Sequence, residues 1–423
     1  MKISIIGAGY VGLATGVGFA SKGHSVICVD VDAERVKRLN KGEPPIYEPM
    51  LTEYLKEVLE KDLFEATTEL TRAVSESEII FICVGTPSKP DGSIDLEFIK
   101  HASKNVGRAI RDKEDYSVIT IKSTIVPGTT EEVIIPLLEK QSGKKAGTNF
   151  GVCVNPEFLR EGQALLDFFK PDRVVIGELD KKSGDTLYQL YRDFTCPIMR
   201  TDLKTAEMIK YASNAFLATK ISFINEIGNI CKRLGIDVYE VAKGIGLDHR
   251  ISPHFLRAGI GFGGSCFPKD LRALIAKARE LKYEPNLLNS VMTLNEKQPL
   301  RLLELLKKHF PNLKGKTIGV LGLAFKPETD DIREAPSIKI VGELLKEGAI
   351  VKAYDPKAMD NFRRIFPHVQ YCERAEEILD SDAVLILTEW EEFRKLDYSG
   401  KVVIDGRRIE EAKTARVYEG ICW

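Results

Sequence analysis

The chain has 423 residues, with 61 Lys and Arg against 62 Asp and Glu, so its formal net charge is −1. This balance gives no reason to expect binding to nucleic acid or to a membrane surface. A hydrophobic content of 43% and a charged content of 29% are those of an ordinary globular protein, and the length predicts two or three domains.

Cysteine and histidine usage predicts a cytoplasmic protein without a metal. The eight cysteines are scattered and form no C-x-x-C pair, which favours a reduced setting. The six histidines show no ligand spacing with them, so we expect no structural metal. The N-terminal residues do not have the pattern of a secretory signal, and no apolar run approaches the ~20 residues that cross a bilayer.

The first 30 residues predict a dinucleotide-binding unit. A short apolar strand at residues 2–6 leads into Gly7-Ala8-Gly9-Tyr10-Val11-Gly12, an apolar helix, and a second strand at residues 24–29 that is followed by Asp30. The pyrophosphate would lie on the positive end of that helix. Asp30 would bond the ribose hydroxyls and repel a 2′-phosphate, which favours NAD over NADP. The alternative for Asp30 is an ordinary turn residue at a strand end.

Later apolar runs also end in polar residues, where open α/β sheets bind ligands. The run 78–84 is followed by Thr86, the run 116–121 by Thr124, and the run 152–154 by a segment with Glu157 and Glu161. The two glutamates would share a face if that segment is helical. Their alternative is a solvated pair at a helix start.

Residues 202–234 predict one long helix, with Asp202 near its start and Gly235 after its end. Its apolar residues are too abundant for one face, so we expect it to link domains or pack on a partner subunit. Lys210 and Asn214 are four residues apart and would point the same way. A lysine on a helix is more often solvated than functional.

Residues 259–270 read GIGFGGSCFPKD and place Cys266 behind glycines and beside Lys269 and Asp270. Glycine would let the backbone approach a ligand closely. A thiolate is a nucleophile favoured by nearby positive charge, and Asp270 could orient water or accept a proton. The alternative is a glycine-rich turn around one buried cysteine.

The last third repeats the strand, loop, helix and strand order of the first, with Asp355 in the place of Asp30. It lacks G-x-G-x-x-G and carries Lys326 and Arg407 at strand ends, which predicts a different, negatively charged ligand. We therefore expect an α/β fold with two doubly wound Rossmann-like domains joined by a long central helix and a helical middle region. The expected domains are an NAD-binding domain at 1–200, a central helical and dimerisation domain with the cysteine loop at 201–300, and a substrate domain at 301–423.

Over nearly its whole length the chain resembles the UDP-glucose 6-dehydrogenase family of nucleotide-sugar dehydrogenases. The resemblance is carried by GAGYVGL, YEPML, CVGTP, KSTIVPGT, NPEFLREG, EMIKYASNAF, GIGFGGSCFPKD, LGLAFKPETDDIREAPS and DGR. Met50 stands where relatives often carry glycine, and Phe262 where many carry tyrosine. The resemblance implies a homodimer that oxidises the C6 alcohol of UDP-glucose to a carboxylate and releases two NADH.

The resemblance also implies roles for single residues. Cys266 would add to the C6 aldehyde, giving a thiohemiacetal that loses a second hydride and a thioester that water hydrolyses. Lys210 and Asn214 would stabilise oxyanions at C6. Thr124, Glu157 and Asp270 would hold and activate water.

The binding residues implied by the resemblance form two sets. NAD would contact Gly7, Gly9, Tyr10, Val11, Gly12, Asp30, Arg35, Thr86, Thr124, Lys269 and Arg333. UDP-glucose would contact Glu157, Phe158, Leu159, Arg160, Glu161, Lys210, Asn214, Phe255, Leu256, Arg257, Ala258, Gly259, Gly263, Phe325, Lys326 and Arg407. Arg250 would reach the UDP-sugar of the neighbouring subunit.

Two alternatives stay open. UDP-N-acetylmannosamine and GDP-mannose 6-dehydrogenases resemble this chain in plan and nucleophile, although the reading GGSCFPKD favours UDP-glucose. A non-catalytic, NAD-dependent sensor of sugar nucleotides is the alternative from another class. The joint presence of Cys266, Lys210, Asn214 and Asp270 argues against a sensor.

Overall fold

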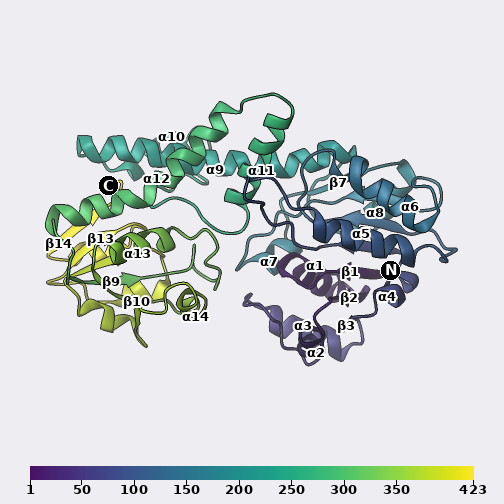
Figure 1. Cartoon of the computed structure of the whole chain (residues 1–423), viewed down its shortest axis with the longest axis horizontal. Helices are drawn as coiled ribbons and strands as arrows, with labels where there is room; N and C mark the ends of the chain where they lie inside the picture. Colours follow the sequence, from purple (N-terminus) through teal and green to yellow (C-terminus); the bar gives the residue numbers. More distant parts are fainter. The chain divides into compact units, whose positions relative to one another are not determined.

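Two doubly wound sheets organise the protein, one in each of two compact units formed by residues 1–212 and 213–423 (Figure 1). The structure is a computed structural model that describes residues 1–423. Helix α9 (Leu203–Leu234) begins in the first unit and ends in the second. None of the helices has both the length and the apolar character needed to span a membrane.

The first unit contains an eight-stranded sheet in the order β3-β2-β1-β4-β5-β6-β7-β8, in which only the β6–β7 pair is antiparallel. The strands are β1 (Lys2–Ile6), β2 (Ser25–Val29), β3 (Phe64–Thr67), β4 (Ile79–Ile82), β5 (Val118–Ile121), β6 (Gly151–Val154), β7 (Val174–Glu178) and β8 (Ile198–Thr201). Strand β4 is three residues shorter than the apolar run 78–84 that predicted it, and β5 is two residues shorter than the run 116–121.

Helices pack on both faces of this sheet. They are α1 (Tyr10–Ser21), α2 (Ala33–Leu39), α3 (Leu51–Glu60), α4 (Leu70–Glu76), α5 (Glu97–Ala109), the π-helix η1 (Thr130–Ile134), α6 (Ile135–Ser142), α7 (Ala164–Phe169) and α8 (Lys181–Tyr191). Ile5 packs in a cluster with α1 and α8, whereas Ile6 packs in a second cluster with α4 and α5. Because both faces are covered, the strands are continuous apolar runs rather than alternating ones.

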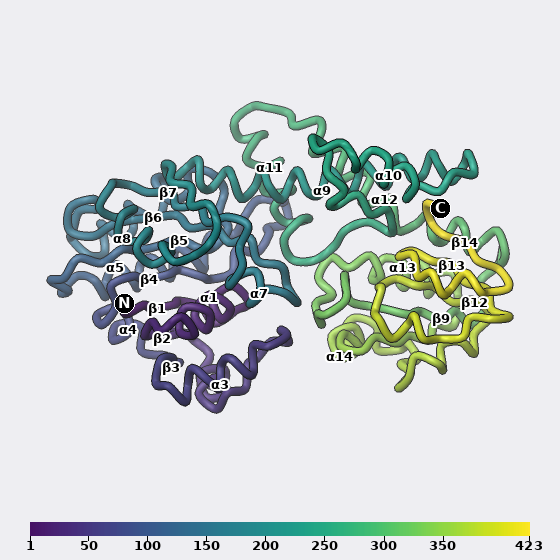
Figure 2. The backbone as a smooth tube through the Cα atoms, turned by 180° about the vertical axis from the view of Figure 1, so that it is seen from behind, coloured from purple at the N-terminus to yellow at the C-terminus, as the bar shows by residue number.

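The second unit contains a six-stranded, wholly parallel sheet in the order β11-β10-β9-β12-β13-β14. Figure 2 labels β9, β12, β13 and β14 in the green and yellow part of the tube. The strand order repeats that of the first six strands of the first unit, so the predicted pair of Rossmann-like folds is confirmed. Its elements are α10 (Val238–Gly246), α11 (Phe267–Glu280), α12 (Asn286–His309), β9 (Thr317–Leu321), α13 (Pro336–Lys346), β10 (Ile350–Tyr354), α14 (Met359–Arg363), β11 (Gln370–Tyr371), η2 (Ala375–Leu379), β12 (Ala383–Ile386), η3 (Glu391–Lys395), β13 (Val402–Asp405), η4 (Glu410–Thr414) and β14 (Val417–Gly420).

The long helix α9 starts and packs as its sequence predicts. The side chain of Asp202 accepts hydrogen bonds from the backbone and hydroxyl of Thr205, at 2.8 and 2.6 Å, and so caps the first turn. Farther along, Ala218 is buried against α11 and α12. A Cβ atom on Gly228 would lie 2.6 Å from the Cβ of Cys422, so this glycine lets the C-terminal segment approach the helix.

Candidate active site

The three glycines of the first loop, Gly7, Gly9 and Gly12, differ in the space that lies beside them. Gly7 has φ of 109°, and a Cβ there would lie 2.9 Å from the carbonyl oxygen of Cys83. A Cβ on Gly12 would lie 1.9 Å from the carbonyl oxygen of Gly7, so both glycines are needed for the turn and for strand–helix packing. A Cβ on Gly9 would meet nothing within 4 Å. The open space beside Gly9, at the start of α1, fits the close approach of a pyrophosphate.

Asp30 is held in place at the end of β2. Its Oδ2 accepts from the backbone N–H of Ala8 at 2.9 Å and from Nη1 of Arg35 at 3.1 Å, and its Oδ1 accepts from the N–H of Asp32 at 3.0 Å. The carboxylate is 8% exposed. The neighbouring Val31 is 95% exposed, an apolar contact surface beside the predicted ribose site that the sequence analysis missed. The sequence could have indicated this exposed side chain, because an apolar residue directly follows the acid at the end of the strand.

Two more predicted cofactor residues meet at the carboxyl ends of β4 and β5. The hydroxyl of Thr86 donates to the carbonyl oxygen of Thr124 at 2.8 Å. A Cβ on Gly85, between β4 and Thr86, would meet nothing within 4 Å, as at Gly9. The surface along these strand ends is therefore open to a ligand, while the threonine side chain fixes the two loops to each other.

Glu157 and Lys210 form a buried ion pair within the first unit. Nζ of Lys210 lies 2.7 Å from Oε1 of Glu157, and both side chains are 5% exposed. Oε2 of Glu157 accepts from the N–H of Leu159 at 2.7 Å. Burial opposes ionisation of Glu157, but the Lys210 ammonium and this N–H outweigh it and lower the pKa of the carboxyl.

The structure decides whether Glu157 and Glu161 share a helix face and whether Glu157 is solvated, two points that the sequence left open. Residues 155–160 are not helical, so Glu157 and Glu161 do not share a helix face, and Glu157 is buried rather than solvated. The ring of Phe158 lies near two cations, with Cζ of Arg173 at 3.8 Å and Nζ of Lys210 at 5.6 Å from its centroid. The ring therefore helps to hold Lys210 in place.

Cys266 occupies the N-cap position of α11 in the second unit and is half-buried. Its Sγ lies 3.5 Å from Oγ of Ser265. The positive end of a 14-residue helix favours a thiolate at this position. The geometry thus supports a nucleophile rather than a buried structural cysteine.

Asp270 lies one turn after Cys266 and is 1% exposed. Its Oδ1 is 2.6 Å from Nζ of Lys269, and its Oδ2 accepts from Nδ2 of Asn214 at 2.7 Å. The structure thus brings together three predicted residues, Asn214, Lys269 and Asp270, beside the cysteine. A carboxylate fixed from both sides can orient a water molecule or accept its proton.

The glycines before Cys266 serve the packing of the loop. A Cβ on Gly263 would lie 2.4 Å from the carbonyl oxygen of Glu334, and one on Gly264 would lie 2.8 Å from the ring of Phe325. On Gly259 it would lie 2.8 Å from the carbonyl oxygen of Gly406. The space that a side chain would need is thus filled by the protein itself, not left open as it is at Gly9.

Three amide side chains, two of them buried, hold the backbone of this loop, a feature that the sequence did not predict. Oδ1 of Asn225 on α9 accepts from the N–H of Gly259 at 2.8 Å, and Nε2 of Gln298 on α12 donates to its carbonyl at 2.9 Å. Asn295 on α12 makes the same pair of bonds to Phe262, at 2.8 and 2.9 Å. The sequence could have indicated these bonds, because amide side chains stand among the apolar residues of the two helices.

The remaining predicted substrate residues are dispersed over the second unit. Phe255 has φ of 64°, a strained left-handed conformation for an aromatic residue. The guanidinium of Arg407 donates to the carbonyls of Leu387 and Phe325, at 2.8 and 3.2 Å. Lys326 lies beside the ring of Phe325, with Nζ at 5.6 Å from its centroid.

Three predicted arginines carry ion pairs with near neighbours in the chain. Arg250 is exposed, and its Nη2 lies 2.6 Å from Oδ2 of Asp248. Arg333 pairs with Asp331 at 2.7 Å, and Arg160 pairs with Asp167 at 2.5 Å. Leu256 and Ala258 are buried, whereas Arg257 is exposed.

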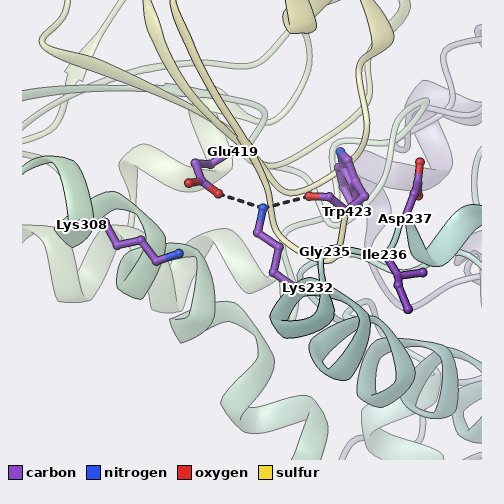
Figure 3. Close-up of a pocket in the computed structure, with 7 residues that line it drawn as sticks. All are labelled: Lys232, Gly235, Ile236, Asp237, Lys308, Glu419 and Trp423. Carbon is purple, nitrogen blue, oxygen red and sulfur yellow. Dashed lines mark hydrogen bonds and ion pairs between the residues drawn. The ribbon is translucent and has the colours of Figure 1, made fainter.

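A depression of about 380 Å³ in the second unit does not coincide with the predicted site (Figure 3). None of the predicted site residues lines it. Lys232 at its centre lies 2.8 Å from Oε2 of Glu419 and donates to the carbonyl of Trp423 at 2.9 Å. Its main charges are therefore neutralised within the protein.

Comparison with known proteins decides the family. Residues 1–195 match the NAD binding domain of the UDP-glucose/GDP-mannose dehydrogenase family, residues 204–297 its central domain, and residues 319–412 its UDP binding domain. The chain belongs to the UDP-glucose/GDP-mannose dehydrogenase family. It is an NAD-dependent oxidoreductase with the family's cofactor domain, and the open space at Gly9 is in that domain.

Individual members of the family match the whole chain. The UDP-glucose 6-dehydrogenase AglM of Haloferax volcanii is 45% identical over 100% of both chains. The GDP-mannose 6-dehydrogenase of Pseudomonas aeruginosa is 40% identical, also over 100% of both. The solved structure of a UDP-glucose dehydrogenase from Pyrobaculum islandicum superposes with a TM-score of 0.96 at 44% identity, covering 100% of this chain and 97% of that one.

Proposed function

We propose that the protein catalyses the NAD-dependent oxidation of UDP-glucose to UDP-glucuronate through a Cys266 thioester. The observation that carries the proposal is Cys266 at the positive end of α11, one turn before an Asp270 held by Lys269 and Asn214. Full-length similarity to UDP-glucose 6-dehydrogenases supports the choice of substrate. We also propose a reducing, cytoplasmic setting, which eight cysteines without a disulfide support.

In this proposal the Gly7–Gly12 loop and Asp30 would hold NAD, which would supply the hydride acceptor for each of two oxidations at C6. The first oxidation leaves an aldehyde, and Sγ of Cys266 adds to its carbon to form a tetrahedral thiohemiacetal. Loss of the second hydride leaves a thioester, whose C–S bond breaks when water attacks. The balance is one alcohol, two NAD⁺ and one water giving one carboxylate, two NADH and three protons.

The residues of the site would stabilise charge and move protons. The Lys210 ammonium and the Asn214 amide donate to the oxygen at C6 when it becomes an oxyanion. Thr124, Glu157 and Asp270 hold the attacking water, and an ionised Glu157 accepts its proton. At the strand ends of the first sheet Asp30 holds the adenosine ribose, while in the second unit Lys326 and Arg407 meet the nucleotide phosphates.

The proposal is tested by NADH release from three sugar nucleotides offered separately: UDP-glucose, GDP-mannose and UDP-N-acetylmannosamine. We expect UDP-glucose to have the highest kcat/KM by at least about tenfold, a discrimination of roughly 1.4 kcal/mol. Preference for GDP-mannose would contradict the substrate assignment but keep the reaction. Binding without NADH release from any of the three would support a sensor instead.

We propose that the chain forms a homodimer through α9. Phe216, Phe223 and Ile230 are 65, 49 and 51% exposed and recur every seven residues, so they form one apolar stripe on the second unit. A self-complementary stripe suits a two-fold interface. Sedimentation should show a dimer that Phe223→Arg converts to monomers, and a monomeric wild type would contradict the proposal. Arg250 would then reach the UDP-sugar of the partner.

A further inference from the structure

Lys122 is a buried lysine beside the Glu157–Lys210 pair to which the mechanism gives no role. It follows β5 directly and is 6% exposed. Its Nζ forms no ion pair and donates to Oδ1 and the backbone carbonyl of Asn155, at 2.8 and 3.4 Å, two residues before Glu157. The same Oδ1 accepts from the hydroxyl of Tyr191 at 2.6 Å, so Asn155 would keep a donor without the lysine.

A buried ammonium without a paired carboxylate is costly, and burial lowers the pKa of Lys122 to about 8. The repulsion of Lys210 acts in the same direction, whereas Glu157 attracts the charge. Conversely, Lys122 is one of the groups that lower the pKa of Glu157. Glu157 therefore lies in the field of two cations, only one of which touches it.

We propose that Lys122 is a positioning residue for the reaction, whose buried charge adds to that of Lys210 in keeping Glu157 ionised and able to accept a proton from water. This inference rests on the proposed role of Glu157. It explains why the interior holds a lysine at a position where an apolar side chain of similar length would fit without the cost of a buried charge.

Other titratable groups near Lys122 do not change charge in the working range. Burial raises the pKa of Cys83, at the end of β4, to about 12, and it also raises the pKa of Tyr191 on α8. Glu157, from the loop after β6, and Lys210, on α9, are the remaining charged neighbours. A change at Lys122 is therefore expected to act on that pair.

Three variants separate charge from structure. Lys122→Gln keeps a donor for Asn155 and removes the charge, and Lys122→Met removes both. Tyr191→Phe removes the other donor to the same oxygen and leaves every charge in place, which makes it the matched control. Because a nearby cation lowers the pKa of a carboxyl, its removal should raise the pKa of Glu157.

The titration of Glu157 is followed by infrared difference spectra of its protonated carboxyl band, assigned by its loss in Glu157→Gln. We expect this band to appear at higher pH in both Lys122 variants, and the acid limb of kcat to move the same way. Tyr191→Phe should leave both unchanged. Unshifted titration in either folded Lys122 variant, or an equal shift in Tyr191→Phe, would overturn the inference. A shifted band with an unmoved kcat limb would support the charge effect and contradict the catalytic role of Glu157.

Discussion

The two Rossmann-like units share a strand order but treat the acid after their second strand differently. Asp30 accepts from two backbone N–H groups and one arginine, beside an open loop at Gly9. Asp355 is fully buried and accepts from four backbone N–H groups and from Nε1 of Trp390. The same residue at the same place thus lies beside an open loop in one unit, where we propose that it binds the ribose, and ties loops together in the other.

The loops after the first strand of each unit differ in the same way. A Cβ on Gly322 would lie 2.4 Å from the Cβ of Thr388, and the following Leu323 and Ala324 are buried. The space that a pyrophosphate would need beside Gly9 is here filled by protein. The strand order alone therefore does not make a dinucleotide site. What distinguishes the two units is whether protein atoms fill the space beside the loop after the first strand.

Removal of the two aspartates should show the largest contrast. Asp355→Ala leaves five buried donors without their acceptor, so we expect a loss of about 3–5 kcal/mol in the free energy of unfolding. Asp30→Ala should lose only about 1–2 kcal/mol but raise KM for NAD at least about tenfold and weaken discrimination against NADP. Urea unfolding and cofactor kinetics measure the two effects. Equal losses of stability in Asp355→Ala and Asp30→Ala would contradict the proposed difference between the two aspartates.

The matched glycines should give a smaller contrast of the same kind. Gly322 has φ of 94° and no room for a Cβ, so Gly322→Ala should cost about 2–4 kcal/mol of stability. Gly9→Ala should change stability by less than about 0.5 kcal/mol and raise KM for NAD, because its Cβ would enter the pyrophosphate space. Unchanged NAD binding in Gly9→Ala would show that this space is not used.

The two units also differ in the buried charge near the end of their fifth strand, which is β5 in the first unit and β13 in the second. Burial lowers the pKa of Lys122, after β5, to about 8 and raises that of Asp405, the last residue of β13, to about 6. Asp405 accepts from the N–H groups of Arg407 and Ile409, both at 2.7 Å, and so shapes the loop that presents Arg407. Lys122 donates only to Oδ1 and the carbonyl of Asn155, at 2.8 and 3.4 Å, and its buried charge forms no ion pair.

Lys122→Met should therefore stabilise the protein at pH 7. Between about pH 8 and 10.5 the unfolded chain binds the lysine proton and the folded chain does not, so wild-type stability should rise with pH there. Below pH 8 the buried charge costs up to about 3 kcal/mol, and we expect a gain of about 1–2 kcal/mol in urea unfolding. A destabilised Lys122→Met at pH 7 would show that the ammonium supports the fold.

Local patterns predicted part of this site, and contacts between distant residues made the rest. The place of Asp30 directly after β2 follows from its spacing to Gly7 within one strand–helix–strand unit. Glu157 is buried because Lys210, 53 residues later, reaches it. The bonds from Asn225 and Gln298 to Gly259 likewise join segments 34 and 39 residues apart. No periodicity in the sequence encodes such pairings.

The most direct test of the account is steady-state NADH formation from UDP-glucose by Cys266→Ser. Serine keeps the size of the side chain but not the thiolate, so we predict a fall in turnover of at least about 10³-fold. Cys372→Ser, at a half-buried cysteine outside the predicted site, is the matched control and should retain wild-type turnover. Sustained turnover near the wild-type rate in Cys266→Ser would contradict thioester catalysis.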